Sequence, residues 1–183
     1  MKLVLGISGA TGAIYAIRLL EVLRDLSVET HLVITEMGKL TISMETEYSV
    51  AAVEKLAGKV YPIRDLAASI SSGSFTTDGM IVAPCSVRTL SAVANCANDN
   101  LVTRAADVTL KERRRLVLLF RETPLHIGHC QLMVDASKMG AIVMPPLPAF
   151  YLKPKTIGEM VDHTVGRVLD FWGLEMPGGK RWG

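Results

Sequence analysis

Hydrophobic positions along the chain alternate between short continuous runs and longer amphipathic segments. Short apolar runs bounded by turn residues are typical of strands that are buried on both faces of a parallel sheet. We expect strands at residues 2–7, 28–35, 60–63, 80–83, 116–120 and 141–144. Because helix-length segments separate these runs, the pattern predicts a doubly wound α/β protein: a three-layer αβα sandwich with a mainly parallel sheet.

The segments between the runs have the periodicity of helices that pack on a sheet. In the first segment Ile14, Ile17 and Leu20 share one face, and Arg18 and Glu21 lie opposite. We expect further helices at residues 37–45, 50–56, 86–95, 101–114, 126–139 and 157–172. No internal repeat or interdomain linker interrupts this order, so we expect one domain, residues 1–183.

Composition narrows the class of protein. The chain is 49% hydrophobic and 5% aromatic with a mean hydropathy of +0.31, which suits buried strands or surface covered in an oligomer. Its 20 basic and 18 acidic residues give a net charge of +2, so no global field attracts nucleic acid. No apolar run reaches the roughly 20 residues that span a bilayer, and we expect neither a membrane segment nor a signal peptide. Three cysteines without CxxC spacing favour the reducing cytoplasm.

Three glycines, one near the end of the first expected strand and two in the turn after it, have a spacing that suits a phosphate or a flavin. Gly6, Gly9 and Gly12 form G-x-x-G-x-x-G, which permits a tight turn and leaves N–H groups free at the next helix. The spacing is not the G-x-G-x-x-G of dinucleotide-binding proteins, and no acidic residue ends the second strand. An ordinary strand–helix turn would also explain these glycines.

A second strand-to-helix turn lies at residues 83–90, APCSVRTL. Ser86 and Thr89 are three residues apart, so both lie on the same side of the helix N-terminus, where hydroxyl and N–H groups can hold an anion. A simple N-cap also explains Ser86. Cys85 has no histidine or acid close in sequence, which favours packing over nucleophilic chemistry.

Arg121 and Glu122 directly follow the strand expected at residues 116–120. Open α/β sheets bind ligands beyond the carboxyl ends of their strands, so this arginine can serve an anion and this carboxylate can move a proton. The basic block at residues 111–115 is interpreted instead as a solvated helix face. His126 and His129 could share a metal, but no further ligands accompany them, which favours capping.

Four prolines stiffen the loop at residues 145–154, which suits the wall of a binding site. In this loop Tyr151 can hydrogen-bond a phosphate, and Phe150 can pack on an apolar group. A plain surface connection is the alternative. Arg167, inside an otherwise apolar helix, would by itself be a solvent-facing residue, and Trp182 would be either a lid or an oligomer contact.

Seven segments together resemble the flavin prenyltransferase family (UbiX-like) and cover nearly the whole chain in the same order. They are SGATG at 8–12, METE at 44–47, SGSF at 72–75, APCSVRTLSAVA at 83–94, RAADVTLKE at 104–112, RETP at 121–124 and PPLPAFY at 145–151. The tail, DFWGLE followed by a terminal RW, is similar to the branch named as the B subunit of phenolic or hydroxyarylic acid decarboxylases.

The resemblance implies a Rossmann-like or flavodoxin-like form of the sandwich and a metal-independent transferase. In this family a dimethylallyl group passes from dimethylallyl phosphate to N5 of reduced FMN, and a second bond to C6 closes a fourth ring. The product, prenylated FMN, is the cofactor of a UbiD-like decarboxylase, the expected partner. Family members form homo-oligomers, often dodecamers. The choice between a phosphate and a pyrophosphate donor stays open.

The resemblance also implies a role for individual residues. Those that match flavin-binding positions are Gly9, Ala10, Thr11, Thr35, Ser86, Val87, Arg88, Thr89 and Arg104. Those that match the group holding the prenyl phosphate are Lys111, which reaches a neighbouring subunit's site, Arg121, Tyr151 and Arg167. Glu45 and Glu122 match acidic positions close to the reaction, and Trp182 matches an aromatic residue near the active site.

The implied chemistry agrees with the residue types. Converging cations and a phenol stabilise a departing phosphate without a metal. Glu122 beside that phosphate can shuttle a proton. The sequence departs from the family at Thr11 and Thr35, where many members have serine, and at residues 126–131.

Two other functions stay open at this point. One is an FMN-dependent decarboxylase of the cysteine-decarboxylase type, which needs no residues for a prenyl phosphate. The other is a non-catalytic flavin-carrier subunit of an aromatic acid decarboxylase.

Overall fold

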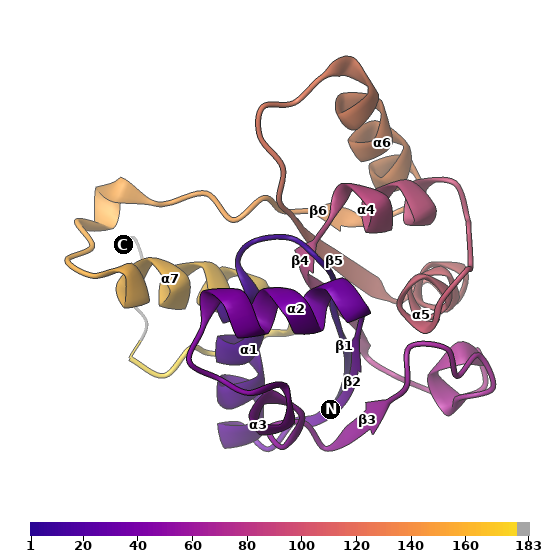
Figure 1. The fold of residues 1–183 in the computed structure, drawn as a ribbon, viewed down its shortest axis with the longest axis horizontal. Coiled ribbons are helices and arrows are strands. Elements are labelled where there is room, and N and C mark those ends of the chain that lie inside the picture. The colour runs from indigo at the N-terminus through magenta and orange to yellow at the C-terminus, as the bar shows by residue number, and fades with distance from the viewer. Residues whose placement is uncertain (179–183) are drawn as a thin grey trace.

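Six parallel strands form one sheet in the computed structural model, which describes residues 1–178 (Figure 1). The strands are β1 (Lys2–Ile7), β2 (Glu29–Ile34), β3 (Lys59–Tyr61), β4 (Gly79–Cys85), β5 (Arg115–Phe120) and β6 (Ile142–Val143). Their order across the sheet is β3-β2-β1-β4-β5-β6, and all neighbouring strands are parallel. The αβα sandwich and its strands are therefore confirmed, and the described sheet is parallel throughout.

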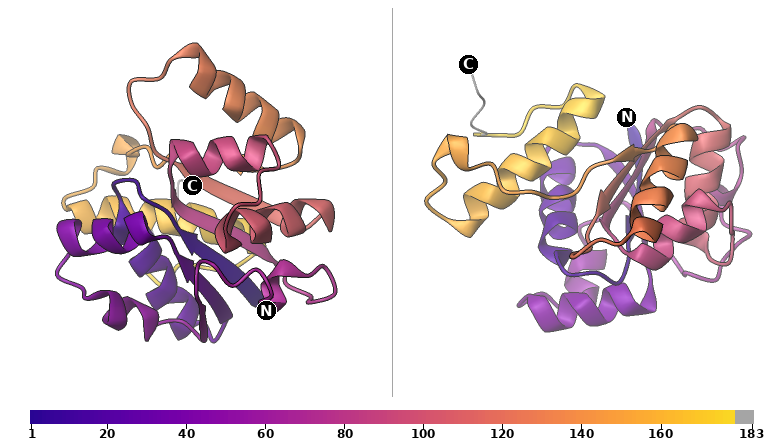
Figure 2. Two further views of the ribbon diagram at one scale, coloured as in Figure 1. Left: turned by 45° about the vertical axis from the view of Figure 1, so that its right-hand side comes forward. Right: turned by 90° about the horizontal axis from the view of Figure 1, so that it is seen from above.

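Helices cover both faces of the sheet (Figure 2). They are α1 (Ala13–Asp25), α2 (Glu36–Glu45), α3 (Val50–Glu54), α4 (Val87–Ala94), α5 (Leu101–Lys111), α6 (Ile127–Lys138) and α7 (Ile157–Leu169). Short 3-10 turns add η1 (Ser69–Ser71), η2 (Phe150–Leu152) and η3 (Asp170–Trp172). The α1 and α7 helices lie on one face, and α4, α5 and α6 lie on the other. No helix within residues 1–178 is long and apolar enough to cross a bilayer.

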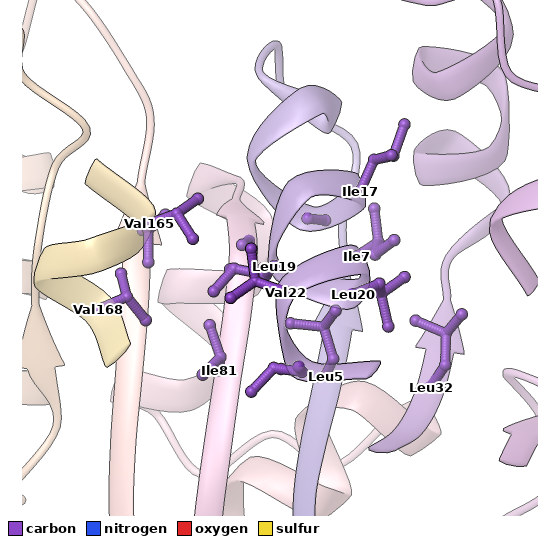
Figure 3. Packing of buried hydrophobic residues seen from close by; sticks show 14 of the residues in the cluster. Leu5, Ile7, Ile17, Leu19, Leu20, Val22, Leu32, Ile81, Val165 and Val168 are labelled. Carbon is purple, nitrogen blue, oxygen red and sulfur yellow. The ribbon is translucent and has the colours of Figure 1, made fainter. Parts of the chain in front are cut away.

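The alternation of side chains along each strand builds two cores. Leu3 and Leu5 of β1 point to the α1 face, whereas Val4 between them points to the α5 face. Figure 3 shows the first core, in which side chains of α1 and α7 meet those of β1 and β4. Both faces of the central strands are buried, which explains why their sequences are continuously apolar.

The helix expected to run to residue 114 ends three residues earlier, at Lys111. Arg113 adopts a left-handed φ of 57°, and the Arg114 N–H donates to the carbonyl of Thr109. The Arg114 guanidinium then donates to the carbonyl oxygens of Gly73 (2.7 Å) and Phe75 (2.9 Å). The interpretation of this basic block as a solvated helix face was therefore wrong for Arg114, which holds a loop distant in sequence.

The strand order creates one switch point. From β1 the chain builds outward through β2 to β3, and it then returns to add β4, β5 and β6 on the other side of β1. The connections that leave β1 and β4 therefore diverge, which opens a crevice beyond their carboxyl ends.

Candidate functional site

A cleft of about 550 Å³ lies at this switch point, a volume typical of small-molecule sites. It is lined by the segments that follow β1, β2, β3, β4 and β5. The expected site residues among its lining are Gly9, Thr35, Ser86, Val87, Arg88, Thr89 and Glu122. The tertiary structure thus brings together residues from four separate segments of the sequence.

Ser8 joins the glycine turn after β1 to the turn after β4. Its side chain is 1% exposed, its hydroxyl donates to the carbonyl of Pro84 (2.8 Å), and the Ser86 N–H donates to that hydroxyl (2.8 Å). Ser8 is part of the SGATG motif, but its spacing in the sequence predicted no role for it. The signal that could have revealed this role is a hydroxyl side chain that directly follows an apolar strand and precedes a glycine turn.

The glycine turn is shaped by close contacts with α2. A Cβ atom at Gly9 would lie 2.3 Å from Cβ of Met37, so only glycine fits there. Gly12 has a φ of 104° and begins α1 without a side-chain cap of its own. Instead, Oε2 of Glu45 accepts hydrogen bonds from the N–H groups of Gly12 (2.8 Å) and Ala13 (3.1 Å). A carboxylate at a helix N-terminus is electrostatically favourable, so Glu45 fixes the turn from the end of α2.

The remaining residues of the glycine turn lie beside the cleft. Ala10 is half-buried and Thr11 is exposed, and neither is part of the lining. On the opposite wall Thr35 caps α2, where its Oγ1 accepts from the Gly38 N–H (3.0 Å). Because a hydroxyl can donate and accept at once, Thr35 keeps a proton for a ligand.

Ser86 caps α4, as the sequence predicted. Its Oγ accepts from the Thr89 N–H (3.3 Å) and lies 3.1 Å from the Thr89 hydroxyl. The first turn of a helix has backbone N–H groups without intrahelical acceptors, and here this turn borders the cleft. Arg88 is exposed at the rim, with its guanidinium 3.3 Å from Oδ2 of Asp99. This wall can therefore hold an anion or a polar ring edge.

Glu122 brings a carboxylate into the cleft directly after β5, and its Oε1 accepts from the Thr123 N–H (2.9 Å). The neighbouring Arg121 N–H donates to the carbonyl of Cys85 (3.0 Å), while the Arg121 side chain is exposed. Burial raises the pKa of the Cys85 thiol strongly, which keeps it protonated and agrees with a packing role. His126 caps α6 through Nδ1, which accepts from the Gly128 N–H (3.0 Å), as predicted.

Arg104 and Lys111 were expected at the site, but within one chain neither lines the cleft. Arg104 Nε donates to the carbonyl of Ser71 (3.2 Å), and its Nη1 pairs with Asp107 (2.9 Å). Lys111 ends α5, which runs back from the cleft toward the amino ends of the strands, and its ammonium group pairs with Glu112. Lys111 thus lies at the opposite edge of the sheet from Glu122.

Tyr151 and Arg167 lie on a third part of the surface. The segment between β6 and α7, orange in Figure 1, extends away from the sheet on the side of the molecule opposite α5 and includes η2, which contains Tyr151. Both side chains are exposed, and Arg167 pairs with Asp170 (3.0 Å). Trp182 lies outside the described residues. One chain therefore assembles the expected flavin-binding residues in a cleft and leaves the expected phosphate-binding residues dispersed.

Known proteins resemble this chain along almost its whole length. A family described as Flavoprotein matches residues 1–169. The flavin prenyltransferase UbiX of Thauera aromatica is 54% identical over 182 residues, which cover 100% of this chain and 94% of the relative.

Two solved structures have a TM-score of 0.98 with this chain. The crystal structure of AnUbiX (PadA1) in complex with FMN and dimethylallyl pyrophosphate is 48% identical and covers 100% of this chain and 97% of its own. A dodecameric FMN-dependent UbiX-like decarboxylase from Escherichia coli O157:H7 is 51% identical and covers 100% of both chains.

Proposed function

Because the chain belongs to the flavoprotein family and, within it, to the UbiX-like flavin prenyltransferases, we propose that its cleft is the site of flavin prenylation. The protein is a prenyltransferase that attaches a dimethylallyl group to N5 and C6 of reduced FMN. The donor is dimethylallyl phosphate or the pyrophosphate that the AnUbiX complex contains.

The observation that carries this proposal is the position of Glu122 inside a flavin-sized cleft at the sheet's switch point. The lack of a side chain at Gly9 lets Met37 of α2 pack directly against the glycine turn, which holds this wall of the cleft in place. Thr35 and Ser86 offer hydroxyls, and the first turn of α4 offers N–H groups. Reduced FMN, when bound, supplies the nucleophilic N5 and C6 positions.

The proposed flavin ligands are the residues of the two turns, Gly9, Ala10 and Thr11 with Ser86, Val87, Arg88 and Thr89, together with Thr35. We retain Arg104 in this group, which requires its guanidinium to turn from the carbonyl of Ser71. Glu122 is proposed to take and return the proton that phosphate departure and ring closure require. Glu45, expected near the reaction, is proposed to act by holding the glycine turn in place.

The proposed ligands of the donor phosphate are Arg121 beside the cleft and Lys111, Tyr151 and Arg167 from other subunits. Lys111 lies at the far edge of the sheet, so within one chain it cannot contact a ligand next to Glu122. We therefore propose that the site is completed in a homo-oligomer, a dodecamer like the E. coli relative. Convergence of these cations on the departing phosphate would replace the charge of a metal ion.

We also propose a partner protein and a cellular location for the enzyme. A UbiD-like decarboxylase is the expected recipient of prenylated FMN. A cytoplasmic location is also proposed, and the three thiols, all free in the structure, are consistent with it.

The test is anaerobic incubation of the purified protein with reduced FMN and dimethylallyl phosphate, followed by mass spectrometry of the released flavin. A flavin heavier by one C5H8 unit is expected. Unmodified FMN, tightly bound, would contradict prenylation and favour a cysteine-type decarboxylase or a flavin carrier. Glu122→Gln is the matched variant, because it keeps the size of the side chain and removes the titratable proton; a transferase loses most turnover, whereas a carrier does not.

A further inference from the structure

His163 lies on α7 between two of the proposed phosphate ligands. Its Nε2 is 3.4 Å from the hydroxyl oxygen of Tyr151, and the two rings meet edge to face with centroids 6.0 Å apart. Arg167 follows four residues later, one helical turn along, so both side chains project from the same face of α7. His163 thus links the 3-10 turn that carries Tyr151 to the helix that carries Arg167.

The side chain of His163 is partly buried beside a small cavity. The ring borders a cavity of about 190 Å³, whose walls include Leu152, Pro154 and Met160 and the carboxylates of Glu159 and Asp162. Asp162 is already paired with Arg18 at 2.6 Å.

Partial burial lowers the pKa of the His163 imidazole, and the positive charge of Arg167 lowers it further, while Asp170 acts in the opposite direction. Because histidine ordinarily titrates near pH 6.5, the ring is mostly neutral at pH 7. A neutral ring adds no further charge next to Arg167.

We propose that His163 is a positioning residue for Tyr151 and orients its hydroxyl toward the phosphate of the prenyl donor. With the imidazole proton on Nε2, His163 donates to the phenol oxygen, and the phenol O–H then points away from α7. In that orientation the hydroxyl can donate to a phosphate that Arg167 also contacts. This inference rests on the proposed function, in which Tyr151 and Arg167 hold the donor.

The first test compares His163→Leu with His163→Gln in the FMN-loaded oligomer. Leucine removes the hydrogen bond, so KM for dimethylallyl phosphate should rise roughly 3- to 10-fold, the range expected from one neutral hydrogen bond. The value of kcat and the affinity for FMN should stay within about twofold. Glutamine keeps an N–H donor and should restore most of the loss. Met160→Leu, on the same cavity wall, is the control and should leave KM unchanged.

A double-mutant cycle decides whether His163 acts through Tyr151. In a Tyr151→Phe background, His163→Leu should cause no further rise in KM. An equal rise in both backgrounds, or no rise in either, would overturn the inference. If the leucine variant does not fold, His163→Asn replaces it, since that amide is too short to reach Tyr151.

Failure of the proposed function gives a different result. Wild-type protein that forms no prenylated flavin contradicts the function, while titration calorimetry with dimethylallyl phosphate still compares binding among the His163 variants. Wild-type protein that binds no dimethylallyl phosphate overturns both proposals.

Discussion

Replacing Ser8 by alanine should loosen the junction between the two turns that form the cleft. The hydroxyl of Ser8 is buried and makes two hydrogen bonds of 2.8 Å, one to the Pro84 carbonyl and one from the Ser86 N–H. The Pro84 carbonyl keeps a second donor, the Ser8 N–H at 3.2 Å, but the substitution removes the acceptor of the Ser86 N–H. The variant therefore loses two hydrogen bonds and leaves one partly buried donor unsatisfied.

The expected cost follows from these contacts. Each neutral hydrogen bond contributes about 1 kcal/mol, and an unsatisfied buried donor costs about 1–3 kcal/mol. Water entering from the cleft can reach the half-buried Ser86 N–H, so we expect a total near 2 kcal/mol. For a chain of this size that loss corresponds to a fall in Tm of about 4–8 °C. Looser turns should also raise the Kd for FMN about five- to tenfold.

The assay is urea unfolding and FMN titration at one fixed protein concentration, because oligomerisation makes apparent stability depend on concentration. Ser43→Ala is the control, since that hydroxyl is exposed and bonds only within its own helix, to the Lys39 carbonyl (3.2 Å). The control should change stability by less than about 0.5 kcal/mol. A Ser8→Ala variant that matches this control in both measurements would refute the view that Ser8 joins the turns.

Three further substitutions test other contacts of the site. Gly9→Ala should abolish FMN binding by titration, because the added Cβ would lie 2.3 Å from Cβ of Met37; Gly158→Ala, with no atom closer than 3.7 Å, should bind FMN normally. Glu45→Ala removes the acceptor of two α1 N–H groups and should cost about 0.5–2 kcal/mol in chemical denaturation, whereas unchanged stability would contradict its capping role. Arg114→Ala should increase hydrogen exchange in residues 69–77, and protection equal to wild type would show that its bonds to this loop are dispensable.

Local pattern was enough to predict most of the fold. The apolar run that became β1 matches its expected bounds, Lys2–Ile7, because both faces of that strand are buried and the positions after Lys2 carry no polar side chain. Ser86 was predicted as an N-cap because its partner, the Thr89 N–H, lies three residues away. The helix ending at Lys111 was predicted too long, because a left-handed residue such as Arg113 leaves no reliable trace in composition.

The contacts that the sequence did not predict are mainly those between segments distant along the chain. Ser8 and Ser86 are 78 residues apart, and Glu45 and Gly12 are 33 apart, so no local spacing reveals either hydrogen bond. The Arg114 guanidinium likewise reaches back 41 residues to Gly73. Each contact exists only because parallel strands gather their carboxyl or amino ends at one edge of the sheet.

The sequence by itself determined the elements, the parallel sandwich, the two turns around the cleft and membership of the flavin prenyltransferases. Only the tertiary structure decided which site residues meet within one chain. Glu122 enters the cleft because it directly follows a strand, whose carboxyl end lies at the switch point. Lys111 does not, because α5 runs antiparallel to the strands and carries its last residue to the opposite edge of the sheet.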